Sequence, residues 1–171
     1  ATANEETAAY IRSVLAIEQW VIDTHVRENL RIDDQRQNMN KIGFLLELAA
    51  SGEKTVVYVN SRKQAVKIAQ MLREKVPQAA RQLICYYHGG LNNADRQAIE
   101  SAFKDGSLRL IVTTSAFGEG IDIPDIRHVV LYHLSFSLEE YNQLAGRAGR
   151  DGQLATIHLL YGERDEALNR I

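Results

Sequence analysis

The sequence is poor in cysteine, in long apolar runs and in net positive charge. Its one cysteine, Cys85, excludes an internal disulfide framework and a zinc site built from several cysteines. No apolar stretch approaches the roughly 18 residues needed to span a bilayer, and the first residues lack the pattern of a signal peptide. These absences predict a protein of a reducing, cytoplasmic environment that has no membrane partner.

The formal net charge of −2 disfavours a protein that coats nucleic acid by bulk charge, but it leaves room for a local strip of donors. The motifs HExxH, GxSxG and CxxC are missing, so small-molecule enzymes of those classes have no support. The phosphate-binding motif GxxxxGK[ST] is also missing. If the chain acts on ATP, it supplies only half of the nucleotide site.

Length and composition indicate one ordinary globular domain. The 171 residues are 45% hydrophobic and 25% charged, enough for a well-filled core. The chain opens on ATANEET without an initiator Met. We therefore expect residues 1–171 to be a single domain cut from a longer protein.

Apolar strands alternate with helices of about a dozen residues. Capping-box pairs stand at Thr2 and Glu5, Ser61 and Gln64, and Ser137 and Glu140. Strands are predicted at 20–26, 54–60, 83–87, 108–114, 127–134 and 155–161, and helices at 11–17, 41–50, 65–76, 92–106 and after Ser137. The polar stretch 26–40 is interpreted as a surface connection. This alternation predicts an α/β fold with a mainly parallel sheet and helices on both faces.

Three unusual loops each follow a predicted strand, at 60–64, 88–93 and 113–125. Ligands bind beyond the carboxyl ends of the strands in open parallel sheets, so we expect the three loops along one edge. A capped helix start with basic residues, a His–Gly–Gly turn and three adjacent hydroxyls are all suited to phosphate. Each loop alone is also compatible with an ordinary capped helix, a satisfied loop histidine or a glycine-rich turn.

The stretch QLAGRAGRDG, residues 143–152, places Arg147 and Arg150 on one face if the helix continues. Arginine forks beside glycines suit bidentate binding of phosphate. The alternative is a helix that ends in basic residues favourable to its dipole. Because the chain has no phosphate loop, the target of these arginines is expected in another domain.

Four stretches together carry a family likeness: VVYVNSR, YYHGGLNNADR, LIVTTSAFGEGIDIPDIRHVV and YNQLAGRAGRDG. In this order and spacing they resemble the second RecA-like domain of superfamily 2 helicases, most of all RecQ-type DNA helicases. The resemblance covers nearly the whole chain. It implies a RecA-like three-layer α/β/α fold within an ATP-dependent DNA helicase that moves 3′ to 5′.

The resemblance also implies residue roles. Gln143, Arg147 and Arg150 match the motif whose arginines reach the nucleotide, and Gly120 and Asp122 match positions near its sugar. Backbone contacts to the tracked DNA strand fall to Ser61, Arg62, His88, Gly89, Thr113 and Thr114. ATP and its Mg²⁺ would be held by the N-terminal RecA-like domain of the same chain, and a bacterial protein would be nucleoid-associated.

The chain departs from the RecQ pattern at two positions. RecQ-type enzymes usually carry Asn where this chain has Asp122, and a Met-like residue where it has Glu119. GIDIPD is similar to the broader superfamily, and the cysteine-rich zinc module of many RecQ proteins is absent from this chain. An RNA helicase, a duplex translocase and a degenerate helicase-like binding module therefore stay open as alternatives.

Overall fold

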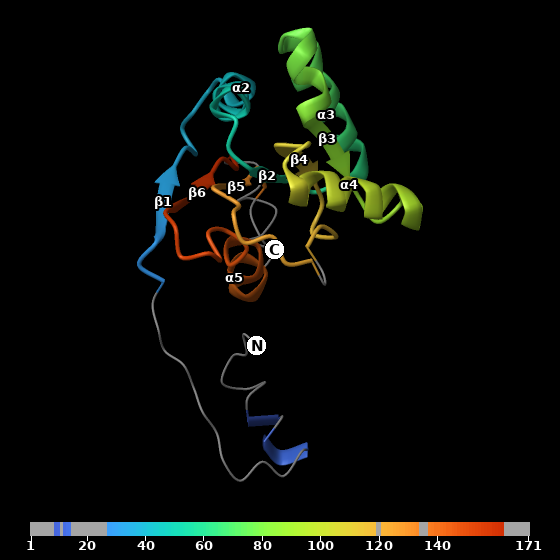
Figure 1. Cartoon of the computed structure of the whole chain (residues 1–171). Coiled ribbons are helices and arrows are strands. Elements are labelled where there is room, and N and C mark those ends of the chain that lie inside the picture. Colours follow the sequence, from blue (N-terminus) through green and yellow to red (C-terminus); the bar gives the residue numbers. More distant parts are fainter. Residues whose placement is uncertain (1–8, 11, 15–26, 119–120, 134–136, 163–171) are drawn as a thin grey trace.

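Six strands form one sheet in the order β1-β6-β5-β2-β4-β3, and every neighbouring pair is parallel (Figure 1). The computed structural model describes residues 9–10, 12–14, 27–118, 121–133 and 137–162. The strands of this part are β1 Leu30–Asp34, β2 Thr55–Tyr58, β3 Ile84–Tyr87, β4 Leu110–Thr113, β5 His128–Leu131 and β6 Ala155–Leu159. The predicted parallel sheet is confirmed.

The helices begin and end at the residue types that favour helix termini. They are α2 Lys41–Ser51, α3 Arg62–Lys75, α4 Asn93–Asp105 and α5 Leu138–Ala145, with a 3₁₀ turn η1 at Gln78–Leu83. The Ser61 and Ser137 side chains accept hydrogen bonds from the third residues of α3 and α5. Gly52 and Gly106 end α2 and α4 in the left-handed conformation that glycine tolerates.

The sheet lies between two helical layers. Val56 and Tyr58 of β2 pack in one apolar cluster with residues of α4 and α5. Val57 and Val59, which alternate with them, pack in a second cluster with residues of α2 and α3. Strand side chains point to opposite faces in turn, so β2 is covered on both sides. This arrangement is the predicted three-layer α/β/α architecture.

The prediction of a surface connection at 26–40 is wrong in part, because Leu30–Asp34 forms β1. This edge strand is polar and its Ile32 is 64% exposed, so it lacks the apolar run that marks a buried strand. Its backbone pairs along β6 from Leu30 to Asp34. The turn η1 was likewise not predicted.

Some predictions fall at the margins of the described part. Residues 12–14 of the helix predicted at 11–17 are helical. The strand predicted at 20–26 and the capping box of Thr2 and Glu5 lie outside the described residues. Within the described ranges, no helix is both long and apolar enough to cross a membrane.

Candidate functional site

The loops that follow β2, β3 and β4 meet at the carboxyl edge of the sheet, as the sequence predicts. Between them lies an open groove of about 620 Å³. It is lined by Asn60, Ser61, Arg62, Lys63, Gly89, Thr114, Ser115 and Ala116. Four of the six residues predicted to contact nucleic acid therefore share one surface although they come from three separate loops: Ser61, Arg62, Gly89 and Thr114.

The groove has a cationic side at the start of α3. Ser61, Arg62 and Lys63 are exposed there, next to the positive end of the helix dipole. The Arg62 guanidinium lies against Gly90, where a Cβ would stand 2.9 Å from Arg62 Nη1. The glycine thus lets the arginine lie close to the turn after β3. Backbone N–H groups, hydroxyls and guanidinium at one place suit a phosphodiester backbone.

His88 and Thr113 are placed differently from their neighbours. His88 is half-buried, its ring stacks on Tyr86 at 5.6 Å, and its Nδ1 accepts a hydrogen bond from the Gly90 N–H at 3.2 Å. A neutral His88 therefore carries its proton on Nε2. Thr113 is fully buried and its hydroxyl donates to the Thr114 carbonyl at 2.8 Å, so only Thr114 of this pair lines the groove.

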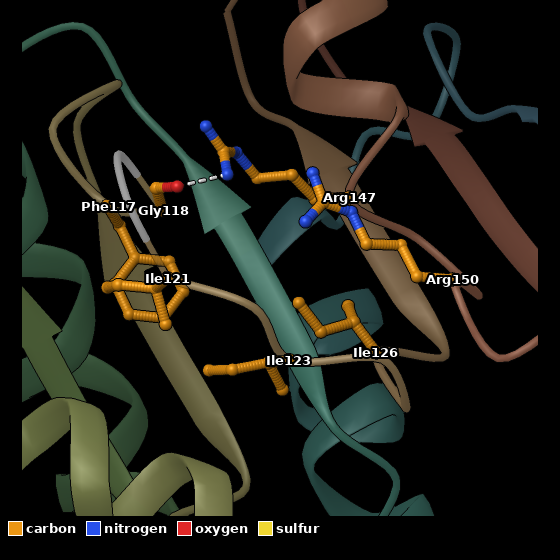
Figure 2. A pocket seen from close by; sticks show the side chains of 7 residues that line it. All are labelled: Phe117, Gly118, Ile121, Ile123, Ile126, Arg147 and Arg150. Carbon is orange, nitrogen blue, oxygen red and sulfur yellow. Dashed lines mark hydrogen bonds between the residues drawn. The ribbon is translucent and has the colours of Figure 1, made fainter.

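The second group of predicted residues gathers in the turn after α5. Arg147 donates to the carbonyl oxygen of Gly118, and Arg150 Nη1 lies 3.1 Å from Asp122 Oδ1. Figure 2 shows the Arg147 side chain reaching toward Gly118. Gly118 has φ +102°, and a Cβ there would collide with the guanidinium. Each of these two contacts thus joins residues that are far apart in the sequence, by 29 positions for the first and 28 for the second.

The two remaining predicted residues are less informative. Gln143 is exposed on α5, one helical turn before Arg147. Gly120 lies outside the described residues.

The Arg150–Asp122 pair is exposed, with side chains 38% and 80% accessible, so it is a weak interaction that an incoming anion can replace.

Beneath the arginines lies an apolar hollow. It is lined by Phe117, Gly118, Ile121, Ile123, Ile126, Arg147 and Arg150, and it measures about 10 Å³, close to the space one water needs (Figure 2). Tyr58 is fully buried nearby, and its hydroxyl donates to the Phe117 carbonyl at 3.4 Å. Burial raises the pKa of Tyr58, and the positive charges of Arg147 and Arg150 oppose that rise.

Arg147 keeps an unused donor in this apolar setting. Its Nε is buried and has no hydrogen-bond partner among the residues that the structure describes. Buried donors are nearly always paired, and Arg96 Nε is the other such donor in the part of the chain that the structure describes. Arg147 is held in place by Gly118, and Arg150 is held by the exposed carboxylate of Asp122 and by the carbonyl oxygen of Gly146, to which its Nε donates at 3.2 Å. The exposed Arg150 guanidinium leaves the cluster able to accept an anionic oxygen.

Two residues that contact this turn were not predicted from the sequence. Arg27 and Asn29 donate to backbone carbonyls within 146–153. They stand in the polar stretch interpreted as a surface connection, where no pattern distinguishes them from solvated side chains. Among the described residues, no cluster of three or more His, Cys, Asp or Glu side chains could hold a metal ion.

Comparisons with known proteins give a family match over most of the chain. The family described as "Helicase conserved C-terminal domain" matches residues 35–152. The chain is 34% identical to the "Probable ATP-dependent DNA helicase RecS" of Bacillus subtilis over 96% of its length, and 36% identical to the "ATP-dependent DNA helicase RecQ" of the same organism over 99%. It spans 34% and 28% of those two proteins.

A solved structure extends the comparison to the fold. The Saccharomyces cerevisiae protein Dbp5, described as bound to RNA and ADP BeF3, superposes with a TM-score of 0.75 at 22% identity. The match covers 98% of this chain and 45% of that one. This similarity confirms the RecA-like fold predicted from the four sequence motifs.

Proposed function

The chain belongs to the family of helicase conserved C-terminal domains, and we propose that it works as the second motor domain of a RecQ-like, ATP-dependent DNA helicase. Its curated relatives are named as DNA helicases, and the chain spans about a third or less of each of the two compared. The activity belongs to the longer protein. In a bacterium such a motor would act in the cytoplasm, at the nucleoid.

For the nucleotide, the chain would supply half of the site. The observation that carries this proposal is the convergence of Arg147 and Arg150 beside Gly118 and Asp122. Both arginines would reach ATP held, with Mg²⁺, by the N-terminal RecA-like domain. Arginines supplied by a partner lobe are worth roughly 10³–10⁵ in rate in comparable NTPases. Gly120 and Asp122 would face the sugar, and Gln143 would line the same cleft.

For nucleic acid, the groove at the end of β2, β3 and β4 would hold the backbone of one DNA strand. Arg62, Ser61, Thr114, the Gly89 backbone and His88 Nε2 are the donors at hand. Thr113 would act from beneath by orienting the Thr114 carbonyl. Contacts to phosphate carry no base identity, so movement, expected 3′ to 5′, would be largely independent of sequence and sensitive to salt.

The test is nucleic-acid-stimulated ATP hydrolysis by the full-length protein that contains this chain. We expect stimulation by single-stranded DNA and a loss of at least about 10³-fold in kcat for Arg150→Ala. The isolated 171-residue chain, without a phosphate loop, should not turn over ATP. Stimulation by RNA alone would instead indicate an RNA helicase, and stimulation by duplex DNA without unwinding would indicate a translocase. Unchanged turnover in Arg150→Ala would favour a degenerate binding module.

A further inference from the structure

The turn that carries the two arginines is irregular, and the Arg27 side chain bonds several of its backbone carbonyls. Arg27 donates from Nη1 to the Gly146 carbonyl at 3.2 Å and from Nη2 to the carbonyls of Ala148 and Gly149 at 2.7 and 2.5 Å. These three acceptors flank Arg147 on both sides. Arg27 lies 119 to 122 residues away from these acceptors in the sequence, shortly before β1 begins at Leu30.

Asn29 adds a second set of bonds to the same turn. Its Nδ2 donates to the Gly149 and Gln153 carbonyls, both at 2.8 Å. The backbone N–H of Gly149 in turn donates to Ile126 O at 2.8 Å, and Asn29 O accepts from the Ala155 N–H at 2.9 Å. Gly149 is thus held on three sides, between Arg147 and Arg150.

Arg27 also provides donors and positive charge at the carbonyl end of α5. The last carbonyls of a helix have no partner within the helix and carry its partial negative charge. Gly146 directly follows α5, and the part-buried guanidinium of Arg27 supplies both the positive charge and several fixed donors. A charge-assisted, forked donor is stronger and more directional than a neutral one.

We propose that Arg27 and Asn29 are positioning residues that hold Arg147 and Arg150 in the geometry needed at the nucleotide. They do not reach the reacting atoms and act only through the turn. This inference rests on the function proposed for the two arginines. Catalytic groups lose about 10²-fold in rate when misplaced by about 1 Å, so loosening this turn should be costly.

The experiment measures DNA-stimulated ATP hydrolysis by the full-length protein with Arg27→Ala, Arg27→Lys and Asn29→Ala. Arg27→Ala is expected to lower kcat by about 10- to 100-fold, with the KM for ATP and the Kd for single-stranded DNA within twofold of wild type. Arg27→Lys keeps the charge but not the fork, so it should recover only part of the loss. Arg36→Ala is the matched control, because Arg36 bonds Asp34 at the end of β1, outside the turn.

A double-mutant cycle separates positioning from a general structural effect. If Arg27 acts through the arginines, Arg27→Ala should add less than about threefold to the loss already caused by Arg150→Ala. Full additivity would overturn the inference, as would a kcat for Arg27→Ala equal to wild type while Arg150→Ala is inactive. Full turnover in Arg147→Ala and Arg150→Ala would instead overturn the proposed function itself. Thermal midpoints, measured for every variant, ensure that each assay is run on folded protein.

Discussion

Lys54 Nζ lies 2.8 Å from Asp125 Oδ1 and 2.8 Å from the carbonyl oxygen of Lys104, while the lysine side chain is only 4% exposed. It also lies over the Phe103 ring, 5.8 Å from the centroid. Lys54 stands just before β2, and Asp125 stands in the loop between β4 and β5. This ion pair therefore fastens the far end of the loop that carries Asp122 and Gly118.

Removing the carboxylate should leave a buried cation without its counter-ion. We expect Asp125→Ala to lower the free energy of unfolding by about 2 kcal/mol, less than for a fully buried pair because Asp125 is 48% exposed. Urea denaturation measures the change. Asp122→Ala is the matched control in the same loop, and its exposed pair with Arg150 should contribute less than about 1 kcal/mol. Equal losses for the two variants would contradict this assignment.

The fold was predictable where strands are apolar. Runs such as TVVY in β2 and LIVT in β4 are buried along their whole length, and such runs are visible without knowledge of tertiary structure. β1 could not be recognised in this way, because LRIDD exposes Ile32 and depends on pairing with β6. The helix caps at Ser61 and Ser137 were predictable because capping is local.

In the candidate site, too, some features follow from local sequence and others depend on tertiary contacts. Residues after strands could be placed at one edge because parallel strands share a direction, and the groove brings Ser61, Gly89 and Thr114 together. Which of two adjacent hydroxyls faces outward depends on the last residue of the strand, so the burial of Thr113 could not be seen. Arg27 was missed because its three acceptors are backbone carbonyls more than a hundred residues away.

Asp33, His158, His128 and Glu53 form a row of polar contacts. We expect this row to make the free energy of unfolding depend on pH. His158 Nδ1 lies 2.7 Å from Asp33 Oδ2, His158 Nε2 lies 3.0 Å from His128 Nδ1, and His128 Nε2 lies 2.8 Å from Glu53 Oε2. Burial lowers the pKa of His158 below its ordinary value of 6.5, and the Asp33 carboxylate opposes that shift. The folded protein therefore resists protonation of this imidazole.

Below about pH 6.5 the unfolded chain takes up a proton at His158 that the folded chain does not, so the free energy of unfolding should fall with falling pH. The contribution is fully present above that pH and is lost as the pH drops below it. Urea denaturation from pH 7.5 to 5.5 measures the slope, and His158→Gln should flatten it. Parallel slopes would assign the effect elsewhere. The carboxyls of Asp34, Asp105 and Asp151 have lowered pKa values and act only in more acidic solution.

Gly149 and Gly152 form a second matched pair, since both have positive φ, of 52° and 80°. A Cβ at Gly149 would stand 2.6 Å from the Gln153 carbonyl oxygen and 2.7 Å from Asn29 Nδ2, whereas at Gly152 no atom of the described residues would lie within 4 Å of it. We expect Gly149→Ala to cost at least about 2 kcal/mol and to lower the ATPase kcat of the full-length protein. Gly152→Ala should cost about 1 kcal/mol from backbone strain alone and keep turnover. Similar losses of turnover would show that the close approach is irrelevant.

Arg62 offers the sharpest test of the groove, because its charge faces open solvent at the start of α3. If it neutralises one phosphate, Arg62→Ala should reduce the slope of log K against log salt by about 0.7 for single-stranded DNA. Lys67→Ala is the control, since Lys67 is exposed on the same helix but does not line the groove. Fluorescence anisotropy on the full-length protein, between about 50 and 200 mM salt, gives the salt dependence of DNA binding for both variants. An unchanged slope for Arg62→Ala, or an equal decrease for both variants, would place the DNA backbone elsewhere. A decrease confined to Arg62 would locate it at the carboxyl edge of β2, where the α3 dipole and the arginine act on the same anion.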